Sequence, residues 1–140
     1  MDLTTALDWA SDRKSAVVIT LRKDGRAQSS DIVYALNNGV FSISLTNTRA
    51  KTKNMERDPR VLLHMTAPDS WSYLSFDGTV ELSAVTTSPD DDTSNALVAY
   101  YEAVAGKPHP NWDEYRQAMI DEGRLIATFT PTSVVGQINS

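Results

Sequence analysis

Short runs of alternating apolar and polar residues fill most of residues 16–85, and they constrain the fold more than any other feature of the sequence. The clearest run, Val40–Leu45, alternates Phe, Ile and Leu with Ser, which is typical of a strand buried on one face. Asn37-Asn38-Gly39 comes directly before it, and Asn and Gly tolerate the positive φ values of a tight hairpin turn. The pattern predicts antiparallel strands joined by hairpins.

Other segments show the same alternation or a β-branched composition, and we predict strands there too. Lys23-Asp24-Gly25 is a turn triplet that joins the first two strands, and Asp77-Gly78 predicts a bulge or bend in the longest one. The predicted strands other than Val40–Leu45 are Ala16–Leu21, Arg26–Leu36, Arg60–Thr66, Trp71–Val85, Leu125–Thr130 and Ser133–Ile138.

Helical signals lie between and around these strands. Leu3–Asp12 and Thr48–Asp58 are predicted as short helices, the second ending where Pro59 disfavours helix in the residue before it. A third helix is predicted to begin with Ser88 as N-cap, and a fourth with Asn111. About six or seven antiparallel strands with helices on the outside predict a mainly β fold, a small barrel with peripheral helices.

Composition excludes several classes of protein. The 140 residues are expected to form a single domain, residues 1–140. Because the chain has no cysteine, disulfides, thiolate zinc sites, iron–sulfur clusters and a cysteine nucleophile are ruled out, and two distant histidines predict no metal site. A net charge of −5 argues against nucleic acid as a partner. No apolar run approaches the roughly 20 residues of a membrane span, and acidic residues near the N-terminus do not fit a signal peptide, so we expect no membrane association and a cytoplasmic location.

Cations gather in one segment. Five of the 13 Lys and Arg residues lie between Arg49 and Arg60, where an even spread would leave about one. Arg49-Ala50-Lys51-Thr52-Lys53-Asn54 opens the predicted second helix, so backbone N–H groups, the helix dipole and cationic side chains can meet one anion there. The pattern is compatible with a phosphate site, and by itself it fits a solvated helix face at least as well.

These motifs, taken in order, identify a family resemblance. Asp24-Gly25-Arg26-Ala27-Gln28, the Arg-Ala-Lys-Thr-Lys-Asn run at 49–54 and Asp58-Pro59-Arg60-Val61 together resemble the pyridoxamine 5′-phosphate oxidase-like split β-barrel family. Within it, the chain looks most similar to the actinobacterial branch that binds the deazaflavin coenzyme F420. Further matching segments, so that the resemblance covers essentially the whole chain, are Trp71-Ser72-Tyr73, 78–82, 90–92, 112–116 and 131–136.

The resemblance implies a split-barrel homodimer with two cofactor sites at the subunit interface. Arg49, Lys51, Thr52 and Asn54 would hold the cofactor phosphate, with Ser44 close by at the end of the preceding strand. In this family the cofactor performs the hydride chemistry, so a catalytic protein residue is not required, and none is assigned.

The same resemblance assigns the ring contacts. Gln28, Ser30 and Asp31 would lie along the deazaflavin ring and its ribityl chain, although relatives often carry Asn at the position of Asp31. Trp71 and Tyr73 would arrive from the second subunit. From the residues alone, a Trp and a Tyr two positions apart on a strand share a face and are equally compatible with a core or a plain dimer contact.

The implied function is an F420-dependent oxidoreductase that transfers hydride from the reduced cofactor to an electron-poor C=C, or a related acceptor, of a small organic molecule. Arg26 would meet the polyglutamate tail, and Lys53, Arg57 and Arg60 add cations that favour F420 over FMN. An FMN-dependent pyridoxamine or pyridoxine phosphate oxidase-like protein and a non-catalytic F420-binding carrier stay as alternatives. His64, on an alternating strand, is expected to be structural.

Overall fold

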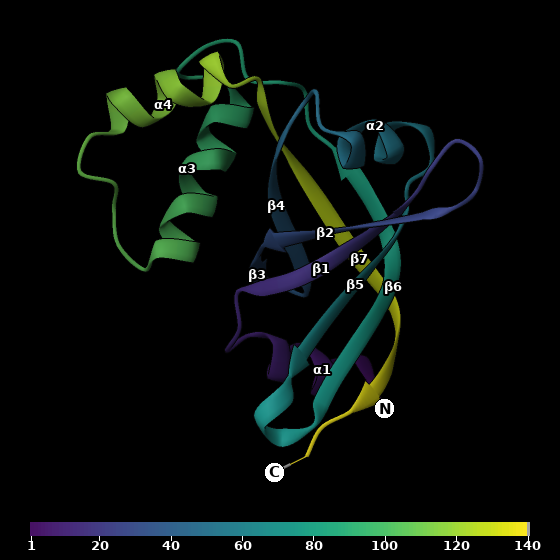
Figure 1. Ribbon diagram of the computed structural model, residues 1–140. Coiled ribbons are helices and arrows are strands. Elements are labelled where there is room, and N and C mark those ends of the chain that lie inside the picture. Colours follow the sequence, from purple (N-terminus) through teal and green to yellow (C-terminus); the bar gives the residue numbers. More distant parts are fainter. Residues whose placement is uncertain (140) are drawn as a thin grey trace.

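The computed structural model describes residues 1–139, which form seven strands, four α-helices and one 3₁₀ turn (Figure 1). The helices are α1 (Leu3–Ala10), α2 (Ala50–Arg57), α3 (Asp92–Ala105) and α4 (Trp112–Asp121), and the 3₁₀ turn is η1 (Pro68–Ser70). The strands are β1 (Ser15–Leu21), β2 (Ala27–Val33), β3 (Ala35–Asn37), β4 (Val40–Thr46), β5 (Arg60–Ala67), β6 (Ser72–Leu82) and β7 (Arg124–Gln137).

All seven strands belong to one antiparallel sheet with the order β2-β1-β5-β6-β7-β4-β3. The sheet curls until β2 at one edge approaches β4 near the other, so that it forms a split barrel (Figure 1). The mainly β, antiparallel split barrel with peripheral helices that the sequence predicted is confirmed. The Asn37-Asn38-Gly39 turn is confirmed as well, with φ of 53° at Asn38 and 79° at Gly39.

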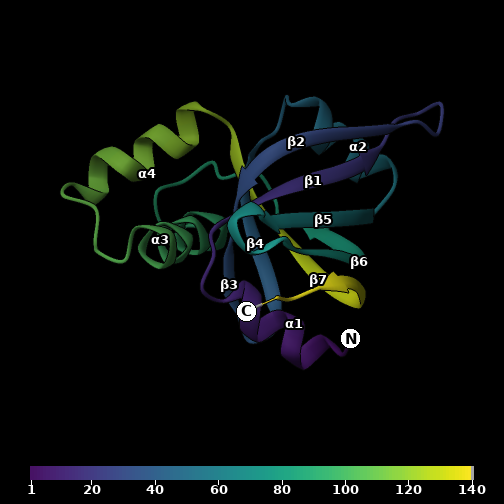
Figure 2. The ribbon, with the colours of Figure 1, turned by 60° about the horizontal axis from the view of Figure 1, so that its bottom comes forward.

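The concave side of the sheet holds an aromatic core. Phe41 contacts Tyr34, Phe76 and Phe129, with ring centroids 5.0, 5.3 and 5.8 Å apart. Apolar residues of α1 close one end of the barrel, and Met55 of α2 is buried in the same core at the other end (Figures 1 and 2). The interior is thus filled by side chains, and ligands must bind at the edges or on the outer face.

Three strand predictions were wrong in their boundaries. The predicted strand Trp71–Val85 is the shorter strand β6, and Trp71 lies in the turn before it instead of sharing a strand face with Tyr73. The predicted strand Arg26–Leu36 is two strands, because the chain turns at Tyr34, whose N–H bonds to Lys14 O at 2.8 Å while its ring enters the core. The two predicted C-terminal strands are the single strand β7, which continues past Pro131. The register shift between Asp77 and Gly78 of β6 absorbs one extra residue of β7 there, which confirms the predicted bulge.

The predicted start of the third helix was also wrong. Asp91, not Ser88, is the N-cap of α3, and its carboxylate accepts from Ser94 N at 2.7 Å. The same carboxylate accepts from Thr87 N at 2.9 Å and Ser88 N at 3.2 Å, which folds the preceding residues into a turn instead of a first helical turn. The N-cap of α4 at Asn111 is confirmed, since its side chain accepts from Glu114 N at 3.1 Å.

Helices α3 and α4 form a pair at one side of the barrel, against β4 and the start of β7 (Figure 2). A small second core holds them, built on Leu97, Tyr115 and Ile126. Within residues 1–139, no helix is long and apolar enough to cross a bilayer.

Candidate functional site

The N-terminus of α2 differs from that of the other α-helices. Arg49 occupies its N-cap and makes no capping hydrogen bond, and the first turn contains no acidic residue. Each of the other three has a side-chain cap, from Asp2, Asp91 and Asn111. The first N–H groups of a helix lack partners within the helix and attract anions. Among residues 1–139, no side chain caps the start of α2.

A cavity of about 290 Å³ opens at this helix end and is called the α2 cavity below. It is lined by Gln28, Ser30, Arg49, Ala50 and Lys51, and none of these described residues is a carboxylate. Gln28 Oε1 accepts a hydrogen bond from Asn54 Nδ2 at 2.8 Å, which leaves the amide nitrogen of Gln28 as its free donor. The cavity therefore combines two cations with hydroxyl and amide donors, a set that matches an anion such as phosphate.

The electrostatics of Lys51 agree with this geometry. Partial burial lowers the pKa of Lys51, and the positive charges of Arg49 and Arg124 lower it further, while Asp31 opposes them. Ion pairs among residues 1–139 are Lys53–Glu56, Arg60–Asp58 and Arg124–Glu122, and Lys51 takes part in none of them. An anion at this place would relieve the mutual repulsion of the three cations.

Two residues assigned to the phosphate lie behind the cavity instead of lining it. Thr52 is fully buried, and its hydroxyl donates to Thr46 O at 2.8 Å, which ties α2 to the end of β4. Asn54 is buried as well, and its Nδ2 donates to Thr20 Oγ1 at 3.0 Å in addition to Gln28. In this structure the two side chains position the α2 cavity from behind.

A second cavity, of about 370 Å³, lies between Lys51 and the helix pair α3–α4. Asp31, Ser44 and Lys51, all assigned from the resemblance, line it. Its other polar lining residues were not predicted from the sequence: Tyr100, Tyr101, Tyr115 and Arg124. Arg124 reaches this place because it pairs with Thr46 in the sheet, a register that no local pattern indicates.

Trp71 has the clearest mark of a binding residue on the outer face of the sheet. Its φ of 56° is left-handed, which is costly for a bulky side chain, and its side chain is 81% exposed. Its carbonyl oxygen accepts from Gln137 Nε2 at 2.9 Å and Asn139 Nδ2 at 3.0 Å, so neighbouring side chains hold this conformation. The result is a large aromatic ring presented to solvent beside Tyr73.

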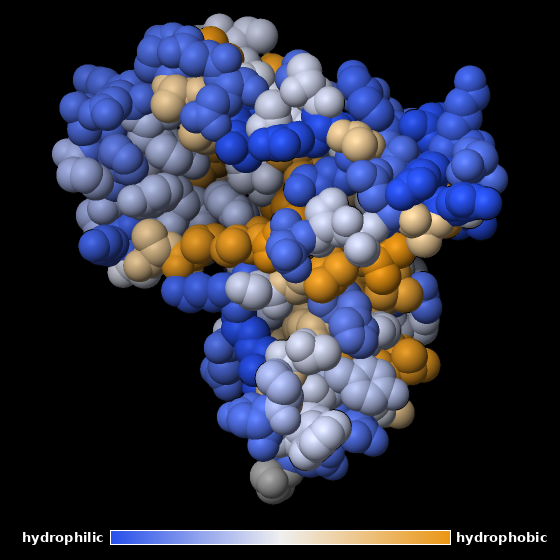
Figure 3. Space-filling model, in the orientation of Figure 1, coloured by the Kyte–Doolittle hydropathy of each residue, from blue (hydrophilic) through white to orange (hydrophobic). Residues whose placement is uncertain are grey.

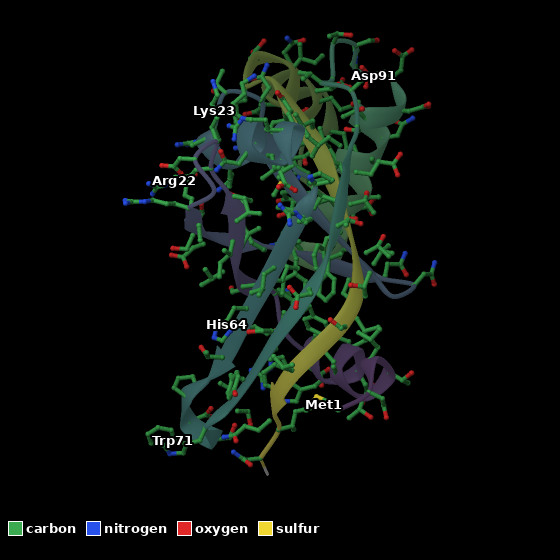
Figure 4. All side chains as sticks on the ribbon, turned by 90° about the vertical axis from the view of Figure 1, so that its right-hand side faces the viewer. Met1, Arg22, Lys23, His64, Trp71 and Asp91 are labelled. Carbon is green, nitrogen blue, oxygen red and sulfur yellow. The ribbon has the colours of Figure 1, made fainter. Side chains whose placement is uncertain are left out.

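Trp71 and the α2 cavity lie far apart within the chain. Figure 4 shows Arg22 and Lys23 at one end of the molecule, near α2, with Trp71 at the opposite end and His64 between them. Trp71 and Tyr73 line a cavity of about 540 Å³ together with His64, and no described residue of the α2 cavity is part of it. Contact of the two aromatic residues with the same cofactor therefore needs a second copy of the chain, and it stays a prediction.

The cations assigned to an anionic tail are mostly committed to other groups. Lys53 pairs with Glu56 at 3.6 Å, Arg60 with Asp58 at 2.7 Å, and Arg57 donates to Asn54 Oδ1 at 3.1 Å. Arg26 lies on the exposed β1–β2 hairpin, where Arg22 N bonds to Arg26 O at 2.7 Å. The hairpin tip carries Arg22, Lys23 and Arg26 beside a single carboxylate, Asp24, and none of the three ion pairs includes these cations.

Several solved structures share this fold. One named F420 reductase has a TM-score of 0.65 at 22% identity, covering 91% of this chain and 94% of that one. A conserved hypothetical protein from Mycobacterium tuberculosis has a TM-score of 0.75 at 18% identity, covering 97% and 84% of the two chains. The heme storage protein HutZ from Vibrio cholerae has a TM-score of 0.68 at 15% identity, covering 96% and 94%. At these identities the likeness shows a common fold and leaves the ligand open.

The family follows from the sequence match over nearly the whole chain. Residues 4–136 match the family model described as pyridoxamine 5′-phosphate oxidase. The matched range contains all seven strands except the last residue of β7, and it contains every residue that lines the α2 cavity. The chain belongs to the pyridoxamine 5′-phosphate oxidase family of split barrels.

Proposed function

We propose that this protein is a reductase that uses coenzyme F420 and delivers hydride to an electron-poor C=C of a small organic molecule. The observation that carries the proposal is the α2 cavity, in which Arg49, Lys51, Gln28 and Ser30 offer two cations and neutral donors, and no carboxylate, to an anion. The phosphate of F420 fits this donor set in charge and in hydrogen-bonding capacity. When bound, the reduced cofactor supplies a hydride, that is, two electrons with one proton.

The protein's own residues bind and orient. Arg49 and Lys51 hold the phosphate, Gln28 and Ser30 direct the chain that leaves it along the edge of β2, and Asn54 keeps Gln28 in place from behind. Ser44 and Asp31 extend this surface on the other side of Lys51. Fixed donors of this kind cost no reorganisation when the ligand arrives.

The proposed active form is a homodimer whose interface is the outer face of β1, β5 and β6. Apolar surface forms a band across the middle of this side of the molecule (Figure 3). Ile19, Leu21 and Leu62 line one hollow on that face, and Val33, 40% exposed, lines another. Contiguous apolar surface of this kind is typical of an interface. In the dimer, Trp71 and Tyr73 of one copy complete the site of the other.

The preference for F420 over FMN rests on the hairpin tip. FMN ends at its phosphate, whereas F420 continues into a lactyl group and a polyglutamate tail. Arg22 and Lys23 lie at the same end of the molecule as α2 (Figure 4), and together with Arg26 they make no salt bridge within residues 1–139, so the three cations are available to a long anionic tail. Salt screens interactions between exposed charges, so the difference in affinity between F420 and FMN should become smaller as ionic strength rises.

The test is a titration of the purified protein with F420 and with FMN, followed by an assay of reduced F420 with 2-cyclohexen-1-one as acceptor. We expect tighter binding of F420 at low salt and enone-dependent loss of the reduced-F420 absorbance. Equal affinities would support the FMN-dependent alternative. Tight F420 binding without turnover of a panel of enones and quinones would support a carrier.

The dimer is tested separately through Trp71→Gly. Glycine accepts a φ of 56° without strain, so we expect the fold to be kept within about 1 kcal/mol. Sedimentation of the variant should show a weaker dimer, and F420 affinity should fall with it because binding and assembly are linked. A monomeric wild-type protein with full F420 affinity would refute this arrangement.

A further inference from the structure

Between the α2 cavity and the aromatic pair of the same chain lies a histidine that the proposed function has not used. His64 is on the outer face of β5, opposite Val17 of β1 and Ser75 of β6. Its Nδ1 lies 2.6 Å from Ser75 Oγ, and its ring centroid lies 5.8 Å from that of Tyr73. The sequence favoured a structural role for His64, but the side chain is only half-buried and is not part of the core.

Two hollows of the outer face meet at this side chain. One, of about 510 Å³, is lined by His64 together with Asp31, Val17 and Val33. The other, of about 540 Å³, is lined by His64 together with Trp71 and Tyr73. His64 and Thr66 are common to both. The imidazole therefore borders the β2 edge, where Asp31 lies, and the aromatic pair.

We infer that His64 is the proton donor for the reduction, an inference that rests on the proposed function. Reduction of a C=C conjugated to a carbonyl adds hydride to the β-carbon, and the π electrons move to the α-carbon and the carbonyl oxygen. The product then needs one proton. His64 as imidazolium releases the proton on Nε2 to the α-carbon and becomes the neutral tautomer that keeps its Nδ1 proton. Solvent then reprotonates the ring.

The neighbours of His64 support this assignment. Ser75 Oγ can accept from Nδ1–H, which fixes the tautomer and leaves Nε2 to act on the acceptor. The titratable groups on the strands around it are Tyr73 and Asp77 of β6 and, across the first hollow, Asp31 of β2. Imidazole is also the side chain that exchanges a proton most readily near neutral pH.

The experiment compares His64→Gln with Ser75→Ala and with His109→Gln. His109 is the chain's other histidine and packs among Tyr101, Trp112 and Tyr115, in the helix pair. With 2-cyclohexen-1-one as acceptor, we expect His64→Gln to lower kcat by about 10²-fold or more, the usual scale of general-acid catalysis, with F420 affinity and KM changed less than about threefold. Ser75→Ala should give a smaller loss, and His109→Gln none.

Two further readouts separate proton donation from a structural role. In the wild-type protein kcat should fall as the pH rises through the titration of the imidazolium, and this limb should be absent in His64→Gln. Of the two histidine Cε1–H resonances in the NMR spectrum, that of His64 should move on addition of oxidised F420, and that of His109 should not.

Failure of the His64 role and failure of the proposed function give different results. Normal kcat in His64→Gln, or an unchanged alkaline limb in that variant, overturns the role of His64 and leaves the proposed function intact. Absence of F420 binding or of enone reduction in the wild-type protein overturns both.

Discussion

The first N–H groups of α3 and of α2 both lack partners within their own helix, and the two helix ends differ in what lies beside those groups. At α3, the carboxylate of Asp91 accepts from the N–H groups of Thr87, Ser88 and Ser94 and from the hydroxyl of Thr86. At α2, the N-cap is Arg49, which makes no such bond, and Lys51 adds a second positive charge. One helix end is capped by the protein itself, whereas the other keeps its N–H donors without a capping side chain, at a cost in stability, and in the proposed function these donors bind the phosphate.

The pKa values express the same contrast. The N–H of Thr87 is the largest influence that lowers the pKa of Asp91 from 3.8 to about 2, so the fold stabilises the charged form of this residue. Burial and two neighbouring cations lower the pKa of Lys51, so the fold destabilises the charged form of that residue. A perturbed charged group without a protein partner is typical of a functional site.

The largest expected effect is on ligand binding at α2. Lys51→Ala removes a charge-assisted contact to the phosphate, worth roughly 1.5–3 kcal/mol, so F420 should bind about ten- to a hundredfold more weakly in calorimetry. Lys53→Ala is the matched control, because Lys53 is exposed and its one ion pair within residues 1–139 is with Glu56, and its effect should be below about threefold. An unchanged dissociation constant for Lys51→Ala refutes the phosphate assignment.

At α3 the expected effect is on stability alone. Asp91→Ala should lower the free energy of unfolding by about 1–2 kcal/mol, the usual cost of losing an N-cap, while F420 affinity stays unchanged. Asp92→Ala, in the first turn, should lower the free energy of unfolding by only about 0.3–0.5 kcal/mol, because it loses only an interaction with the helix dipole. Since the folded pKa of Asp91 is about 2, below the ordinary 3.8, its contribution is present above pH 3.8 and is lost as the pH falls toward 2. Urea unfolding at neutral and acid pH measures both effects, and equal losses in the two variants would contradict the capping role.

An N-cap acceptor at α2, like the one at α3, should make the start of α2 more stable and less able to bind an anion. Arg49→Ser supplies an N-cap acceptor and removes one of the cations around Lys51, so we expect a gain of about 0.5–1 kcal/mol in thermal or urea unfolding. The same variant should bind F420 more weakly. Arg49→Ala, which loses the charge without adding an acceptor, is the control for the cap. A loss of stability in Arg49→Ser would show that the Arg49 side chain stabilises the fold and would contradict the view that α2 lacks a cap.

The smallest expected effect is a pH dependence of binding. Phosphate prefers the ammonium form of Lys51, and the pKa of Lys51 in the free protein lies below the usual 10.5. Affinity for F420 should therefore fall, by about a few-fold, as the pH rises through this lowered pKa, earlier than for an ordinary lysine. Lys51→Arg keeps its charge over this range and should show a flat profile in the same fluorescence titration. A decline that persists in Lys51→Arg would assign the effect to another group.

Much of the fold could be predicted because its signals are local. Alternation along β4 and the positive φ that Asn38 and Gly39 tolerate depend only on neighbouring residues, and so does the cap of α4 by Asn111. Ser88 misled the prediction because Asp91, three residues on, forms the stronger set of hydrogen bonds. Competition between nearby caps depends on the path of the chain before the helix.

The sequence by itself determined that α2 begins with cations and has no acidic cap, since that is a property of adjacent residues. Only the tertiary structure decided what those cations face. Gln28 and Ser30 reach Lys51 because β2 pairs with β1 and α2 packs on β1. Pairing of distant strands likewise brings Arg124 beside Lys51 and sets His64 between Asp31 and Trp71. The physical reason is that strand order depends on the burial of the whole core, and no local period records which strand lies beside which.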